Sequence, residues 1–151
     1  MNLEFRPMRE SDLPRVTQIE ERSFGAPWSE STFRGLMRRP SACLIVAEGV
    51  DEVVGFFAMW FAAGKAELGD LVVHPTYRRK GVGGKLLARA LGEARQRAAK
   101  TVFLEVRESN TAARALYEAV GFSVLTIRKG YYSMPEEDAV VMRLELVENV
   151  R

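Results

Sequence analysis

The apolar and polar positions of the first 24 residues predict a short strand followed by a helix. Residues 3–6 have the composition of a strand. Ser11 or Asp12 can cap the helix that follows, and Pro14 suits its first turn. Apolar residues then recur at helical spacing, at Leu13, Val16 and Ile19. We expect this helix to end near Phe24.

A second helix start lies at Ser29, a residue type that favours the N-cap position. Trp28 and Phe33 have the spacing of a hydrophobic staple. Glu30 is favourable near the positive end of a helix dipole. We expect this helix to run to about Arg38.

Three stretches rich in Val, Ile, Phe and Leu come next, as is typical of strands. They are residues 42–47, 53–61 and 66–73. Turn signals lie between them at residues 49–51 and at Gly64. The pattern therefore predicts an antiparallel meander of three strands.

The second half of the chain alternates helices with strands. A long amphipathic helix follows the glycines near Gly83, with apolar residues at helical period through to about Ala98. A helix over residues 110–119 is stopped by Gly121, which suits a left-handed cap. The remaining expected strands are residues 101–106, 122–127 and 139–146. The whole pattern predicts an α/β (α+β) fold, a mixed sheet with helices on its faces.

Composition supports one ordinary globular unit. The chain has 151 residues, of which 47% are hydrophobic and 28% charged. A chain of this length buries enough surface to fold alone. No linker, repeat or low-complexity tract interrupts it, so residues 1–151 are expected to form a single domain.

Net charge and cysteine content limit the kinds of partner and binding site that we expect. The formal net charge is only +2, with basic residues dispersed among acids, which disfavours nucleic acid. Cys43 is the one cysteine in the sequence and His74 the one histidine. We therefore expect neither an intrachain disulfide nor a zinc site, and a reducing cytoplasm fits best. Residues 53–63 are too short to cross a bilayer, and no signal peptide is recognised. We expect a cytoplasmic monomer or weak dimer without a membrane or nucleic-acid partner.

The segment from Arg78 to Gly84 has the features of a phosphate seat. Glycines let a backbone turn expose successive N–H groups, and at a helix start those donors and the helix dipole both favour an anion. Nearby basic residues add positive charge: Arg78, Arg79, Lys80 and Lys85. The spacing is neither that of a P-loop nor that of a dinucleotide-binding turn. A glycine-rich turn with solvated basic residues is the alternative.

This segment belongs to a longer motif, Leu71-Val72-Val73-His74-Pro75-x-Tyr77-Arg78-x-x-Gly81-x-Gly83. The motif resembles the coenzyme A-binding signature of the GNAT superfamily. The resemblance implies a mostly antiparallel sheet of about seven strands flanked by four helices, with acetyl-CoA as acyl donor and no metal. It implies that loop amides hold the pyrophosphate and that residues 68–73 offer backbone groups to the pantetheine arm and the thioester. The implied coenzyme-binding residues are Leu71, Val72, Val73, Arg78, Arg79, Lys80, Gly81, Val82, Gly83, Gly84, Lys85, Asn110 and Tyr117.

Glu105 and Tyr117 are candidates for proton transfer. A carboxylate near an apolar strand face is costly unless it has a partner or a task. A free α-amino group has a pKa of about 8 and must lose a proton before it attacks, and a carboxylate can accept that proton. A tyrosine hydroxyl can donate one to the departing thiolate. The alternatives are an ion pair of Glu105 with Arg107, a core position for Tyr117 and an N-cap role for Asn110.

Several further blocks resemble the ribosomal-protein-alanine N-acetyltransferases and their protein N-terminal acetyltransferase relatives. The blocks are Pro27-Trp28-Ser29-Glu30, residues 104–122, Arg128-x-x-Tyr131-Tyr132 and Glu137-Asp138-Ala139-x-x-Met142. The resemblance implies Glu105 as general base and Tyr117 as general acid. It places Trp28, Tyr131 and Tyr132 in the wall that receives the acceptor. The implied acceptor is the amino-terminal alanine of small-subunit ribosomal protein eighteen.

Other readings stay open. Glu67 or Asp70, on the strand before the glycine loop, is the rival base. A lysine side chain or a small-molecule amine is the alternative acceptor, and a non-catalytic acyl-CoA sensor is the alternative to an enzyme. Cys43 is expected to be a small buried residue rather than a nucleophile. His74 is expected to be a surface or turn residue.

Overall fold

The structure is a computed structural model that describes residues 2–146. Within these residues a seven-stranded sheet runs in the order β1-β2-β3-β4-β5-β7-β6. The strands are β1 (Glu4–Pro7), β2 (Ala42–Glu48), β3 (Val53–Ala62), β4 (Lys65–Val73), β5 (Thr101–Arg107), β6 (Ser123–Tyr132) and β7 (Glu137–Glu145). The helices are α1 (Leu13–Ser23), α2 (Glu30–Met37), α3 (Val82–Gln96) and α4 (Thr111–Ala119). Two 3₁₀ turns are η1 (Glu10–Asp12) and η2 (Pro75–Tyr77). The expected α/β class and mostly antiparallel sheet are confirmed.

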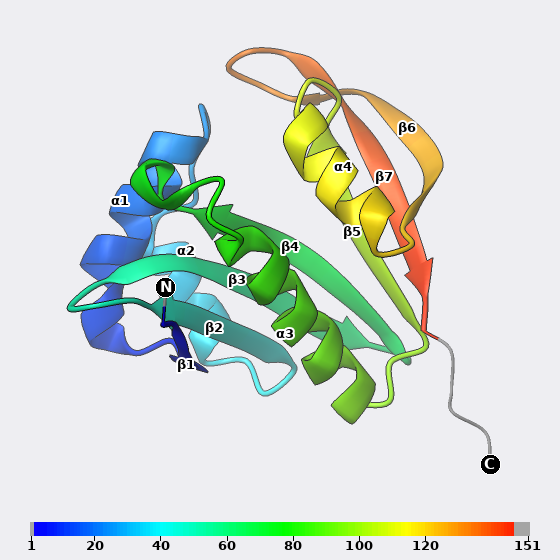
Figure 1. Cartoon of the computed structure of the whole chain (residues 1–151). Coiled ribbons are helices and arrows are strands. Elements are labelled where there is room, and N and C mark those ends of the chain that lie inside the picture. The colour runs from blue at the N-terminus through cyan, green and yellow to red at the C-terminus, as the bar shows by residue number, and fades with distance from the viewer. Residues whose placement is uncertain (1, 147–151) are drawn as a thin grey trace.

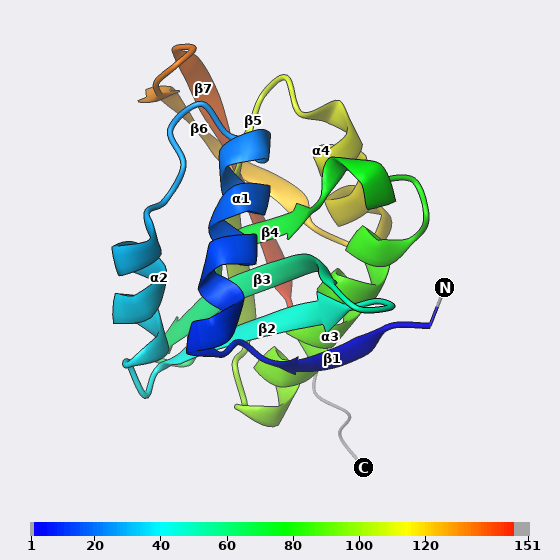
Figure 2. The same cartoon turned by 90° about the vertical axis from the view of Figure 1, so that its left-hand side faces the viewer.

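The helices form layers on the two faces of the sheet. Buried side chains of α3 and α4 share one apolar cluster with the strands, and those of α1 and α2 share another. Figure 1 shows α3 in front of the sheet, and Figure 2 shows α1 and α2 covering the opposite face. No helix within residues 2–146 is both long and apolar enough to cross a bilayer.

Both helices expected near the amino terminus begin where predicted, but only one has the predicted side-chain cap. Ser29 Oγ accepts a hydrogen bond from Thr32 N, and the Trp28 and Phe33 rings lie 5.5 Å apart, so this cap and staple are confirmed. Asp12 occupies the N-cap position of α1, but its side chain makes no cap bond. Its carboxylate instead accepts hydrogen bonds from the Arg6 guanidinium.

The parallel pair β4 and β5 creates the opening on which the site depends. Every other neighbouring pair is antiparallel. The pairing of β4 with β5 runs from Lys65 to Leu68 and stops there, and the two strands then separate (Figure 1). Gly69 is an extra residue opposite β3 at this point. A Cβ on Gly69 would lie 2.2 Å from the Trp60 ring, so glycine is needed here.

Strand β6 is longer than its pattern predicts. The expected end was Ile127, but the strand continues to Tyr132. Its residues from Ser123 to Tyr131 are all exposed, because β6 is the edge strand outside β7. An edge strand that buries neither face carries no apolar alternation, which is why the polar run after Ile127 did not indicate a strand.

Phe57→Ala is expected to lower the free energy of unfolding by about 3–5 kcal/mol, since truncating a buried Phe loses transfer energy and leaves a cavity. Phe57 is fully buried in the cluster beneath α3. Urea denaturation measures the change. Val50→Ala is the matched control, because Val50 is exposed in a turn and should change stability by less than about 0.5 kcal/mol. A Phe57 variant as stable as the control would contradict this core assignment.

Candidate active site

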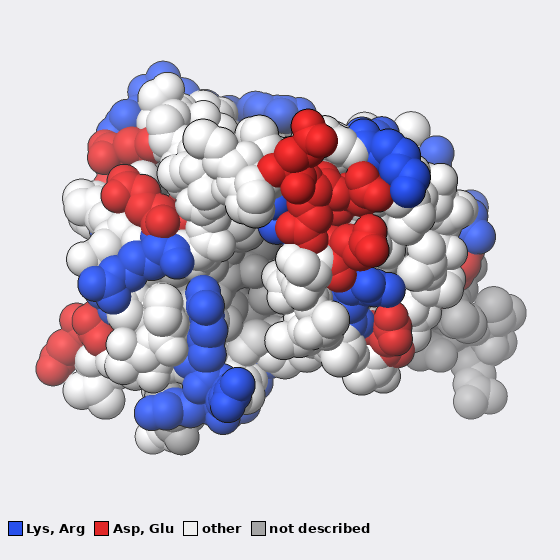
Figure 3. All heavy atoms as spheres, turned by 90° about the horizontal axis from the view of Figure 1, so that it is seen from above, with Lys and Arg blue, Asp and Glu red and all other residues white. Residues whose placement is uncertain are grey.

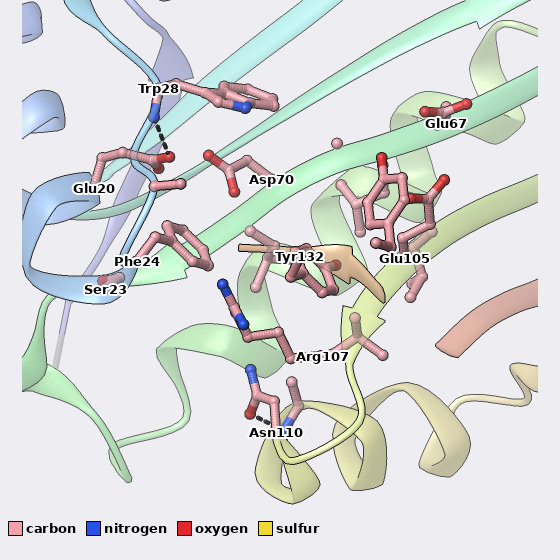
Figure 4. Close-up of a pocket in the computed structure, with 18 of the residues that line it drawn as sticks. Glu20, Ser23, Phe24, Trp28, Glu67, Asp70, Glu105, Arg107, Asn110 and Tyr132 are labelled. Carbon is pink, nitrogen blue, oxygen red and sulfur yellow. Dashed lines mark hydrogen bonds between the residues drawn. The ribbon is translucent and has the colours of Figure 1, made fainter. Parts of the chain in front are cut away.

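A cavity of about 470 Å³ lies where β4 and β5 separate. Its walls come from the end of α1 and the loop after it, from β3, β4, β5 and α4, and from the end of β6. The lining side chains that carry polar groups include Glu20, Ser23, Trp28, Glu67, Asp70, Glu105, Arg107, Asn110, Tyr117, Tyr131 and Tyr132. Figure 4 shows acids on two sides of this space, with Tyr132 and Arg107 between them. We call it the acceptor cavity.

A second cavity of about 440 Å³ adjoins the acceptor cavity. The two share lining residues from α1, β4 and α4, among them Leu71 and Asn110. Most residues that the signature assigns to coenzyme A line the second cavity, namely Leu71, Val72, Val73, Arg78, Arg79, Gly81, Val82, Gly83 and Asn110. Lys80, Gly84 and Lys85 line neither cavity, and Tyr117 lines the acceptor cavity.

The glycine loop ends in a helix start with free donors. Gly81 is the N-cap of α3 and has φ of 81°, a conformation that glycine adopts without strain. The first amides of a helix have no carbonyl partner within it, and the dipole there favours an anion. Arg78 is fixed beside this turn by hydrogen bonds to Val73 O and Ser23 Oγ. The geometry fits a bound phosphate.

The β5-facing edge of β4 is free over the segment that leads to this loop. Pairing with β5 ends at Leu68, and residues Leu71 to Val73 pair only with β3. Backbone N–H and C=O groups on an unpaired strand edge need partners. A pantetheine arm carries amides that can supply them, so this edge and the phosphate seat together fit coenzyme A.

Glu105 lies on β5 with its carboxylate in the acceptor cavity. Its ion pair is with Arg128 at 3.6 Å, not with Arg107 as the alternative reading proposed. Its interaction with the Tyr131 hydroxyl raises the pKa of Tyr131. Glu105 Oε2 is buried and has no hydrogen-bond partner among the described residues. One carboxylate oxygen therefore remains available to a substrate or a water.

Tyr117 is both a core residue and a cavity residue. It is 7% exposed, packs against Phe122 with ring centroids 5.7 Å apart, and lines the acceptor cavity. Burial, and then the nearby Asp70, raise the pKa of the Tyr117 phenol. The hydroxyl is therefore neutral at working pH and able to donate a proton.

The rival bases line the same cavity in different surroundings. Glu67 lies beside Glu105, and partial burial followed by the Glu105 charge raises its pKa. Asp70 is buried on the side of β4 that faces α1, against Glu20. The fold thus brings all three candidate acids to one cavity, together with Glu20, which sequence reasoning missed. The signal for Glu20 was an acid four residues after Val16, on the buried face of α1.

The three aromatic residues assigned to the acceptor wall all line the acceptor cavity. Trp28 packs 6.2 Å from Trp60 on one side. Tyr131 and Tyr132 meet edge to face at 5.1 Å on the other. Asn110 Oδ1 accepts from Ala113 N, so Asn110 is an N-cap that also lines both cavities.

Arg107 fixes the loop between β6 and β7, a role that sequence reasoning missed. Its guanidinium donates to Ser133 O at 2.8 Å and to Pro135 O at 2.9 Å. It also pairs with Glu137 and lies 4.5 Å from the centroid of the Tyr132 ring. A fork of planar donors makes these contacts together, which a single ammonium cannot do.

Arg107→Lys is therefore expected to raise the KM for a peptide acceptor about tenfold while the affinity for coenzyme A changes little, since one lost charged hydrogen bond is worth about that factor. Steady-state kinetics and calorimetry measure the two quantities. Arg143→Lys is the matched control, because Arg143 is a half-exposed arginine on β7 away from the cavity. Equal KM values in the two variants would refute the positioning role.

Charge is segregated on the face that contains the opening. Figure 3 looks down on the end of the sheet and shows a hollow with Lys and Arg gathered mainly on one side and Asp and Glu on the other. Arg78 and Arg79 line the second cavity, whereas Glu67, Asp70 and Glu105 line the acceptor cavity. Such a field favours an anion on one side and a cationic amine on the other.

Cys43 and His74 lie outside the acceptor cavity. Cys43 is buried, as expected, and burial raises the pKa of its thiol to about 11. His74 does occupy a turn, but it is buried rather than on the surface. Its Nδ1 accepts from Thr76 N, which makes it the cap of η2.

Comparison with known sequences identifies the family. The profile described as "Acetyltransferase (GNAT) family" matches residues 13–122, which span α1 to α4, all of the second cavity's lining and most of the acceptor cavity's. This chain belongs to the GNAT acetyltransferase family. The expected enzyme class, an acyltransferase, is confirmed with it.

Known relatives of this GNAT chain align with it over nearly their whole length. It is 38% identical over 138 residues to the [ribosomal protein bS18]-alanine N-acetyltransferase of Salmonella typhimurium, covering 90% of this chain and 93% of the relative. The crystal structure of the Escherichia coli ribosomal-protein-S18-alanine N-acetyltransferase superposes with a TM-score of 0.88 at 34% identity, over 99% of each chain. Arabidopsis thaliana NAA60 in complex with acetyl-CoA has a TM-score of 0.87 over 96% of this chain and 99% of its own, and at 20% identity supports the fold alone.

Proposed function

We propose that this GNAT enzyme transfers the acetyl group of acetyl-CoA to the α-amino group of a protein, with the amino-terminal alanine of ribosomal protein bS18 as its substrate. The relatives named for that reaction support the substrate. The observation that carries the proposal is the acceptor cavity, where Glu105 and Tyr117 line one space beside the coenzyme seat.

Acetyl-CoA occupies the second cavity in this proposal. The amides around Gly81 and Gly83 hold the pyrophosphate, with Arg78 and Arg79 beside it. The free edge of β4 from Leu71 to Val73 receives the pantetheine arm. The shared boundary of the two cavities then puts the reactive thioester, which supplies the acetyl group, at the acceptor cavity. Proximity of amine and thioester supplies much of the rate.

Two side chains move protons. Glu105 accepts a proton from the acceptor's ammonium group, directly or through a water, through its unpartnered oxygen. The amine then forms a C–N bond to the thioester carbon. Tyr117 donates its phenolic proton as the C–S bond breaks and the coenzyme A thiolate leaves, and the second proton lost by the nitrogen restores the phenol. The tyrosine is suited to this because its raised pKa keeps it protonated.

Aromatic walls favour a chain end over a bulky acceptor. Trp28 on one side and Tyr131 and Tyr132 on the other border the cavity. An extended peptide can enter between them with its amino terminus first. We propose further that residues 1–151 act as one domain, as a cytoplasmic monomer or weak dimer.

The test supplies acetyl-CoA with an alanine-starting peptide that also contains a lysine, and locates the acetyl group by tandem mass spectrometry. The proposal predicts modification of the α-amine, and loss of reaction when that amine is blocked. Modification of the lysine, or reaction with polyamines only, would favour the other acceptors. Coenzyme A binding without turnover of any amine would favour a sensor.

A further inference from the structure

Two carboxyl groups that the reaction above does not use face each other beside the acceptor cavity. Glu20 comes from α1 and is 2% exposed, and Asp70 comes from β4 and is 8% exposed. Figure 4 shows their side chains pointing toward one another on the side of the cavity opposite Glu105. Neither has an ion pair with a Lys or Arg within residues 2–146.

Only one of the two groups is charged. Two buried carboxyl groups that face each other cannot both ionise, because their like charges repel strongly out of water. Trp28 N donates to Glu20 Oε2 at 2.9 Å, which stabilises a charge on Glu20. Burial first, and then Glu20, raise the pKa of Asp70 well above its usual range. The pair therefore carries one proton, on Asp70, and one negative charge.

The pair is incompletely satisfied. Glu20 Oε1 and Asp70 Oδ2 are buried and have no hydrogen-bond partner among the described residues. Both residues line the acceptor cavity. Buried acceptors without donors are costly, and a buried charge more so, unless something supplies donors and an opposite charge. An ammonium group has three donors and a positive charge.

The position suits the reacting amine. Asp70 directly precedes Leu71, where the free edge of β4 adjoins both cavities. An ammonium bound at Asp70 and Glu20 would lie beside the segment assigned above to the thioester. Glu105 and Glu67 also attract a cation, but Arg128 lies near both and partly offsets their charge.

We propose that Glu20 and Asp70 form a binding subsite for the protonated α-amino group of the acceptor, acting as one proton-sharing pair with one negative charge. This inference rests on the proposed function. It identifies the groups that bind the acceptor's ammonium before Glu105 accepts a proton from it. The competing view is that the pair only ties α1 to β4. The two interpretations differ in whether the peptide's affinity depends on its positively charged amino group.

Amide substitutions test the shared charge while they keep the size of each side chain. Asp70→Asn leaves Glu20 charged, and Glu20→Gln leaves Asp70 able to ionise, so each single variant keeps one negative charge. The double variant has an amide at both positions and no charge. Calorimetry in the presence of coenzyme A then measures the Kd of an alanine-starting peptide and of its des-amino analogue. The ratio of the two Kd values isolates the amine.

In the wild type the amine-bearing peptide is expected to bind at least about tenfold more tightly than its analogue, the worth of one charged hydrogen bond. Both single variants should keep this ratio within about threefold, and the double variant should lose it. Glu67→Gln, an exposed acid of the same cavity, is the control and should keep the ratio. Thermal melting and coenzyme A affinity confirm that each variant folds.

The subsite would be refuted if the double variant kept the wild-type ratio of Kd values. It would also be refuted if a single variant lost as much of that ratio as the double variant. Wild-type protein that acetylates the peptide but shows no preference for the amine would overturn the subsite and leave the proposed function standing. Wild-type protein that neither binds nor acetylates the peptide would overturn both.

Discussion

Glu105→Gln is expected to lower kcat for an alanine-starting peptide about a hundredfold at neutral pH, the scale of a lost general base. The amide keeps the size of the side chain and its contact with Tyr131 but accepts a proton poorly. An α-amine has a pKa of about 8, so above that pH the acceptor loses its proton to solvent without help. The deficit should therefore shrink as the pH rises from 7 to 9. A pH series of initial rates, read as thiol release, measures this.

The rival bases provide the controls for that series. Glu67→Gln and Asp70→Asn are expected to keep kcat within about threefold of the wild type, since neither removes the proposed proton acceptor. A normal rate for Glu105→Gln together with a large loss in Glu67→Gln or Asp70→Asn would move the base to β4. A deficit that stays constant with pH would mean that Glu105 does not accept the amine's proton.

Tyr117→Phe is expected to lower kcat about a hundredfold with little change in the Kd of acetyl-CoA, because the phenol donates its proton only as the thiolate leaves. The phenylalanine ring can keep the packing against Phe122. Single-turnover rates and calorimetry separate the chemical step from coenzyme binding.

Tyr77→Phe is the matched control for this loss. Tyr77 lines the second cavity but not the acceptor cavity, and its hydroxyl donates to Glu52, so its removal should leave kcat at saturating acetyl-CoA within about threefold. If Tyr117→Phe kept the wild-type kcat, the general-acid role would be refuted and Tyr117 would be a core residue only. If it lost coenzyme affinity as much as kcat, its role would be in binding.

Local chemistry made most of the elements predictable from sequence. The Ser29 cap and the Trp28–Phe33 staple depend on residues a few positions apart, and both are present as expected. The meander of β2, β3 and β4 could be predicted because β2 and β3 are mostly buried and β4 alternates buried with more exposed positions. The full length of β6 could not be predicted, because an exposed edge strand needs no pattern of apolar residues.

The site was predictable where it depends on the backbone and less so where it depends on distant contacts. The glycine loop before α3 could be recognised because positive φ and free amides have a sequence signature. The partner of Glu105 could not, since Arg128 on β6 and Arg107 on β5 are equally plausible until the sheet order is known. The Glu20–Asp70 pair joins residues 50 positions apart across α1 and β4, which no local pattern encodes.

A crystal structure with coenzyme A and an alanine-starting peptide would show both ligands at once. We predict that the pyrophosphate lies against the amides of residues 81–83, that the sulfur lies at the boundary of the two cavities beside Tyr117, and that the peptide's amino terminus lies within the acceptor cavity. Coenzyme A bound away from the gap between β4 and β5, or a peptide terminus outside that cavity, would contradict this prediction.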